Sequence, residues 1–113
     1  MKLLTKAIEA KLPKLYATDG QNLTPVVVKF FDPTGSWTWY AIEGEKQEDG
    51  DWLFFGMVDG FEKELGYFTL NELIHAKDNC HGFRSLPIER DKWFDGYVLN
   101  KETKSVTHNT KAA

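Results

Sequence analysis

Four acidic residues have the spacing that places pairs of carboxylates on one face of a β-strand. The pairs are Glu62 with Glu64 and Glu89 with Asp91. Side chains at positions i and i+2 of an extended segment point the same way. If the two segments were neighbours, the four carboxylates could bind a divalent cation such as Mg²⁺ and support hydrolysis of nucleic acid or nucleotides. The simpler interpretation pairs these acids with Lys63, Arg90 and Lys92 on a solvated face, so no metal site is expected.

A second set of potential ligands consists of His75, Cys80 and His81. Imidazole and thiolate are the groups that Zn²⁺ prefers. The spacing matches no standard zinc template, and His108 is a distant fourth ligand. We therefore interpret these residues as ordinary surface positions and expect no cofactor.

The middle of the chain is locally acidic. Eight acids fall between positions 43 and 64, against only Lys46 and Lys63; they are Glu43, Glu45, Glu48, Asp49, Asp51, Asp59, Glu62 and Glu64. Such a surface could approach a basic protein groove that normally holds nucleic acid, and it disfavours direct contact with phosphates. The simpler interpretation is a solvated face. Lysines near the N-terminus leave a nucleic-acid-binding accessory domain as an alternative; they are Lys2, Lys6, Lys11 and Lys14.

Three tryptophans, Trp37, Trp39 and Trp52, lie in segments typical of β-strands. They could form a stacking platform for bases or sugars. Aromatic strands of small domains usually face the core, so we expect a core role. The three serines of the chain lie in no nucleophile elbow, and no phosphate-binding glycine loop is present, so catalysis is not expected.

The composition indicates one folded domain. The chain has 113 residues, of which 42% are hydrophobic and 27% charged, with a net charge of -3. Its apolar runs are far shorter than the roughly 20 residues that span a bilayer. The N-terminus lacks a signal-peptide pattern, and the single cysteine agrees with a reducing compartment. A cytoplasmic protein without a membrane role is therefore expected.

These side chains need a scaffold, and the periodicity predicts a meander of strands with two helices. Leu4, Ile8 and Leu12 predict a short amphipathic helix, which Thr5 caps and Pro13 ends. Asp-Pro-Thr-Gly at 32–35 predicts a hairpin turn. The expected elements are helices over 3–12 and 69–76, strands over 25–31, 36–43, 52–58 and 63–68, an edge strand over 86–90, and loops over 17–24, 44–50 and 78–85.

The best-specified helix start is Thr69-Leu70-Asn71-Glu72, which has the form of a capping box. Phe68 and Leu73 flank it as a hydrophobic staple. We predict an α+β fold with a four- to five-stranded, mainly antiparallel meander sheet and two short helices packed on one face. Trp93, Phe94 and Tyr97 suggest a last packed segment. Residues 1–99 would form the domain and residues 100–113 a polar, disordered tail.

Several segments together resemble the bacterial and phage family called domain of unknown function 2958. The segments run from about Leu12 to Phe94 and include Lys29-Phe30-Phe31, Trp37-Thr38-Trp39-Tyr40, Phe54-Phe55-Gly56-Met57-Val58-Asp59-Gly60, Glu62-x-Glu64-Leu65-Gly66-Tyr67-Phe68 and Ile88-Glu89-Arg90-Asp91. The resemblance implies cargo of plasmids, integrative elements and phages, often near DNA-modification and antirestriction genes. It transfers no catalytic residues.

We therefore expect a non-catalytic protein-binding module of a mobile genetic element. Its partner would be a host protein, such as a nucleic-acid-binding CRISPR or restriction complex, contacted through the acidic hairpin surface. The metal-dependent hydrolase and the nucleic-acid-binding accessory domain stay open as alternatives.

Overall fold

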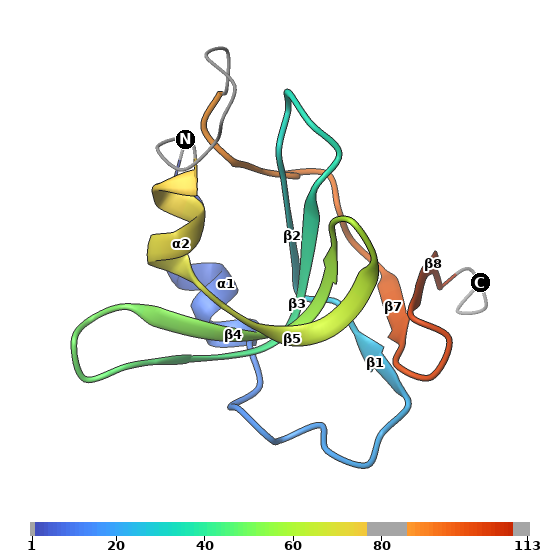
Figure 1. Cartoon of the computed structure of the whole chain (residues 1–113). Coiled ribbons are helices and arrows are strands. Elements are labelled where there is room, and N and C mark those ends of the chain that lie inside the picture. Colours follow the sequence, from blue (N-terminus) through green and yellow to red (C-terminus); the bar gives the residue numbers. More distant parts are fainter. Residues whose placement is uncertain (1, 77–85, 110–113) are drawn as a thin grey trace.

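The computed structural model describes residues 2–76 and 86–109. Its elements are α1 (Lys6–Lys11), β1 (Leu23–Pro25), β2 (Val28–Phe31), β3 (Thr38–Lys46), β4 (Trp52–Asp59), β5 (Lys63–Thr69), α2 (Leu70–Ile74), β6 (Glu89–Arg90), β7 (Tyr97–Asn100) and β8 (Ser105–His108). Five strands form one antiparallel sheet in the order β5-β4-β3-β2-β6, and three form a second in the order β1-β7-β8 (Figure 1). The predicted antiparallel meander with two short helices is confirmed.

The β2–β3 turn lies where the sequence predicts it, whereas the β3–β4 hairpin is longer than predicted. The turn between β2 and β3 closes as expected, with the Asp32 amide donating to the Trp37 carbonyl at 3.0 Å. Strand β3 continues beyond its predicted end at Glu43, because residues 44–46 pair with 52–54 of β4. A register shift between Ala41 and Glu43 marks a β-bulge, which changes the direction of the following side chains.

Both faces of the five-stranded sheet are covered. One core contains Leu12 after α1 and Leu73 of α2, together with Phe30 and Phe54 of the sheet. The other core is formed by Val26, Ile42, Met57 and Leu99. Figure 1 shows both helices on the side of the molecule away from β7 and β8. Alternating large side chains on β3 thus enter two different cores, as expected for a strand with bulk on both faces.

Local signals set the starts of both helices. The Thr5 hydroxyl accepts a hydrogen bond from the Ile8 amide at 3.3 Å, which caps α1. At α2 the Glu72 amide donates to the Thr69 hydroxyl at 3.0 Å, and the Glu72 carboxylate accepts from the Thr69 amide at 3.1 Å. The predicted capping box is therefore confirmed.

The second sheet was not predicted. Strand β1 lies partly in the expected loop 17–24, and β8 lies in the expected tail, so a disordered tail from residue 100 is wrong for 105–108. Both strands pair with β7, which places Leu99 in the second core and Val106 against it. The two segments are only three and four residues long, so their local signal is weak. Pairing with β7, burial of Thr24 in β1 and packing of Val106 in β8 outweigh it.

The C-terminal part of the meander is shorter than predicted. Strand β6 spans only Glu89–Arg90 of the expected 86–90, and it pairs with β2 at the sheet edge. Phe94 and Tyr97 pack against the second core as expected, whereas Trp93 is 92% exposed. The expected loop 78–85 lies outside the described residues.

Candidate functional site

The eight predicted acidic residues do not form one surface. Strand β4 has eight residues, so its two ends are about 25 Å apart. We call residues 45–51 the hairpin tip and residues 59–64 the β4–β5 turn, and these lie at opposite ends of β4. Glu43 is buried, Glu45, Glu48, Asp49 and Asp51 belong to the hairpin tip, and Asp59, Glu62 and Glu64 belong to the β4–β5 turn. The single acidic face expected from sequence is therefore wrong.

Glu43 is a structural residue and cannot contact a partner. Its side chain is 1% exposed and accepts hydrogen bonds from the amides of Tyr16 at 2.8 Å and Thr18 at 2.9 Å. The Thr18 hydroxyl donates to the same carboxylate. Lys101 Nζ in turn donates to the Thr18 carbonyl at 2.8 Å and lies 3.1 Å from its hydroxyl. Glu43 thus connects β3 with the segment before β1 and with the β7–β8 turn.

The hairpin tip extends away from the rest of the molecule (Figure 1). Asp49 accepts a hydrogen bond from the Asp51 amide at 2.9 Å, which orders the turn. Asp51 accepts from the amides of Trp52 at 2.8 Å and Asn71 at 3.0 Å, so this carboxylate ties the tip to α2. The exposed acids of the tip are Glu45, Glu48 and Asp49.

The β4–β5 turn carries an exposed aromatic ring among its acids. Phe61 is 94% exposed and meets Trp37 edge-on, with 5.3 Å between ring centroids. The Trp37 ring lies so close to Gly60 that an added Cβ would come within 2.5 Å of it. Trp39 and Trp52 pack against the first core, which confirms the core role expected for these two residues. Trp37 instead contributes a half-buried ring beside Phe61.

The proposed metal quartet is not assembled. Strand β5, which contains Glu64, and strand β6, which contains Glu89, lie at opposite edges of the five-stranded sheet. Four strand spacings of about 4.8 Å separate these edges by roughly 19 Å. Within residues 2–76 and 86–109, no three His, Cys, Asp or Glu side chains gather as a metal site would require. The hydrolase hypothesis therefore loses the geometry on which it rested.

Of the potential zinc ligands, His75 and His108 can be described. His108 lies in β8, and its ring meets the Tyr97 ring edge-on with 4.9 Å between centroids. His75 lies in another part of the fold. It follows α2, and its Nδ1 lies 2.9 Å from the Asn71 carbonyl oxygen. Cys80 and His81 lie outside the described residues. The N-terminal lysines Lys2, Lys6, Lys11 and Lys14 are exposed. Lys6 forms an ion pair with Glu9 at 3.6 Å.

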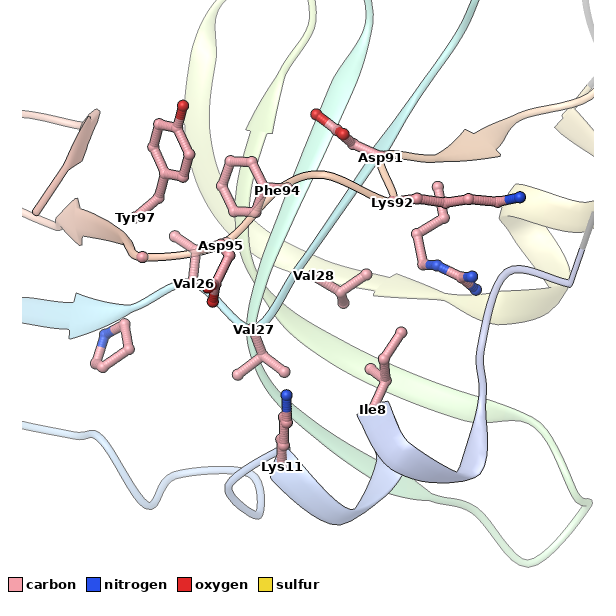
Figure 2. Close-up of a pocket in the computed structure, with 13 residues that line it drawn as sticks. Ile8, Lys11, Val26, Val27, Val28, Asp91, Lys92, Phe94, Asp95 and Tyr97 are labelled. Atoms are coloured by element: carbon pink, nitrogen blue, oxygen red, sulfur yellow. The ribbon is translucent and has the colours of Figure 1, made fainter.

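Sequence reasoning missed a groove between α1 and residues 91–97. It has a volume of about 750 Å³, and its apolar floor includes Ile8, Val27 and Val28. Figure 2 shows Ile8 and Lys11 rising from α1 toward the valines, with Phe94 above them. Charged side chains of both signs line the rim. The groove therefore suits the binding of a polar chain that inserts an apolar side chain better than it suits catalysis of a proton transfer. The run of three valines at 26–28 was the available signal in the sequence.

A cluster of polar and aromatic groups lies beside this groove. Lys29 Nζ is 3.8 Å from an Asp91 carboxylate oxygen, and it lies 5.9 Å and 5.7 Å from the ring centroids of Tyr40 and Phe94. Phe94 stacks on Tyr97 with 4.2 Å between centroids. Burial, followed by the negative charges of Asp59 and Asp91 and the nearby Tyr97, raises the pKa of the Tyr40 phenol above its ordinary 10.0.

The raised pKa of Tyr40 predicts a loss of stability in alkaline solution. The folded state holds this proton more tightly than the unfolded state, so the contribution is complete below pH 10 and is lost as the pH rises through the folded-state pKa. Tyr40→Phe should reduce the fall in the urea midpoint between about pH 9 and about pH 11. The pKa of Tyr67 is also raised, first by its hydrogen bond with Tyr16, and Tyr67 is present in both chains. The contribution of Tyr40 is therefore the difference between the variant and the parent chain. An identical fall in both chains would contradict this assignment.

The fold and its surfaces define a small protein built mainly from antiparallel sheet, with two short helices and two acidic projections. The chain belongs to the family described as Protein of unknown function (DUF2958), whose model matches residues 2–105. The match confirms the resemblance and extends beyond the segments that carried it. No curated protein and no solved structure matches the chain. Among the described residues, no helix is long and apolar enough to cross a membrane.

Proposed function

We propose that this chain is a non-catalytic, cytoplasmic protein-binding module of a mobile genetic element that inhibits a host defence complex. The complex would be a CRISPR or restriction assembly whose nucleic-acid groove is basic. The observation that carries the proposal is the projecting hairpin tip with its exposed Glu45, Glu48 and Asp49. The implied plasmid and phage setting of the family supports the choice of partner.

Charge complementarity explains how such a tip would act. Carboxylates on a projection can approach lysines and arginines that otherwise bind phosphates, and opposite charges accelerate the encounter. Lys46 offsets only part of the charge of the tip. The helices, proposed to pack together on one face of the sheet, would leave the tip free to enter a groove.

The site offers more support for binding than for the alternatives. The acid pairs of the hydrolase hypothesis lie at opposite sheet edges. Of the lysines of the nucleic-acid hypothesis, Lys6 is paired with Glu9. Neither alternative is favoured by a specific contact.

Neutralising the hairpin tip should abolish partner capture. The test variant combines Glu45→Gln, Glu48→Gln and Asp49→Asn, and it keeps Asp51 because that carboxylate holds the Asn71 amide. Host proteins captured from lysate are identified by mass spectrometry, and the affinity for the purified partner is then measured. We expect at least a tenfold loss that diminishes at high salt.

The matched control removes three charges elsewhere through Glu9→Gln, Asp19→Asn and Glu102→Gln. These side chains lie outside the tip, so this variant should bind the purified partner like the parent chain. Equal capture by the tip variant, the control and the parent would remove the proposal.

A further inference from the structure

Among the strands that the structure describes, none pairs with the outer edge of β5. In the five-stranded sheet β5 pairs with β4 on one side only, and its register runs without a shift from Asp59↔Lys63 to Leu53↔Thr69. Antiparallel neighbours alternate between pairs that exchange two hydrogen bonds and pairs that exchange none. One known hydrogen bond in this register therefore fixes which backbone amides of β5 point away from β4.

The Gly60 amide donates to the Glu62 carbonyl at 3.2 Å, which sets the alternation. The amides of Glu64, Gly66 and Phe68 then point to β4, and those of Lys63, Leu65 and Tyr67 point outward. The Thr69 amide continues the outward set, and it donates to the Glu72 side chain instead of a strand. Among the described residues, no hydrogen bond uses the outward amides of Leu65 and Tyr67.

Side chains along this edge offer little protection against strand addition. Natural edge strands are usually short, bulged, interrupted by proline or lined with charged side chains, especially lysine. Strand β5 is seven residues long, contains neither proline nor a bulge, and carries its two charges, Lys63 and Glu64, only at its start. Gly66 leaves open space at its centre, where nothing lies within 4 Å of an added Cβ.

We propose that β5 binds an extended segment of a partner protein by strand addition, and that this segment carries lysine or arginine. Backbone hydrogen bonds would supply affinity, and side chains would supply selectivity. The exposed Glu62 and Glu64 at the start of the edge outnumber Lys63, so a basic strand is complementary to it. The same excess of negative charge repels a second copy of this chain.

This inference rests on the proposed protein-binding function for its biological partner, but its test uses synthetic peptides. The first probe is a capped seven-residue peptide of alternating lysine and valine. The second replaces lysine by glutamate, and the third replaces the central valine by proline. Amide hydrogen exchange of the full chain is followed by NMR with up to about 1 mM of each peptide.

Without peptide, the Leu65 and Tyr67 amides should exchange faster than those of Glu64, Gly66 and Phe68. The lysine peptide should slow exchange at Leu65 and Tyr67 at least tenfold, while the other two peptides should leave it unchanged. The inference is overturned if the lysine peptide fails to bind, or if it binds without protecting these two amides. Protection in the free chain together with dimerisation would assign the edge to a second copy and also overturn it.

A proline variant tests the same geometry independently. Leu65→Pro removes an outward amide, and Leu65→Ala is the matched control for the lost packing. Leu65→Pro should abolish binding of the lysine peptide, whereas Leu65→Ala should bind within about threefold of the parent chain. Equal binding by the two variants would overturn the inference. If Leu65→Pro does not fold, the exchange measurement on the parent chain decides.

The proposed function and this inference can fail separately. Loss of host capture by the tip variant, with no peptide protection of β5, keeps the proposed function and overturns strand addition. Normal capture by the tip variant, with protection of Leu65 and Tyr67, removes the hairpin-tip contact and keeps the β5 edge as a binding surface.

Discussion

Replacing Glu43 by alanine should destabilise the fold by about 3 kcal/mol or more. The carboxylate accepts from two backbone amides and one hydroxyl inside the protein, and alanine leaves both amides without their acceptor. Each unsatisfied buried donor costs about 1–3 kcal/mol. The Thr18 hydroxyl would also lose the carboxylate to which it donates. The Lys101 ammonium, which is held at Thr18, would lose that nearby negative charge.

Urea denaturation followed by tryptophan fluorescence measures this loss. Glu43→Gln keeps one acceptor oxygen and should lose less than Glu43→Ala. Glu45→Ala removes an exposed carboxylate two positions away and should change stability by no more than about 0.5 kcal/mol. A loss below about 1 kcal/mol for Glu43→Ala would show that water or a neighbouring group replaces the carboxylate.

Gly56→Ala should be at least as damaging, through a different mechanism. A Cβ at this position would lie 2.8 Å from the Tyr40 carbonyl carbon and 3.0 Å from Ala41 Cα, both of which are backbone atoms. Backbone cannot move aside as a flexible side chain can, so the central pair of strands must separate. We expect a loss of about 3 kcal/mol or more, or failure to fold.

The matched control lies directly across the sheet. Gly66 of β5 pairs with Gly56 of β4, but nothing lies within 4 Å of a Cβ built on it. Gly66→Ala should therefore be neutral or stabilising by about 0.5 kcal/mol, because alanine reduces the freedom of the unfolded chain. Thermal denaturation of both variants compares them. Equal destabilisation of the two variants would contradict the role assigned to close backbone approach at Gly56.

Features encoded by adjacent residues could be predicted from the sequence. The capping box at Thr69 and Glu72 needs only four consecutive positions, and the turn after Phe31 needs only Pro33 and Gly35. The alternating large residues of β3 likewise indicated bulk on both faces. In each case the decisive contacts lie within a few positions along the chain.

Features that depend on distant segments could not be predicted. Glu43 was assigned to the surface because acids are seldom buried, and its partners Tyr16 and Thr18 are far away in sequence. The spacing of Glu62 and Glu64 could not indicate that Glu62 lies in the turn before β5, nor the strand order that separates Glu64 from Glu89. Strands β1 and β8 are three and four residues long, too short for a clear periodic signal, so their pairing with β7 defines them.

The pairing of β1 with β7 also constrains how the protein can emerge from the ribosome. The meander from β2 to β5 pairs successive segments and can form as they are synthesised. Strand β1 must wait for residues 97–100, which are synthesised after the whole of the β2–β5 meander. Until then Ile42 and Met57 lack the cover of Leu99. Nascent chains stalled before residue 97 should therefore bind chaperones, and the C-terminal strands should be essential to release them.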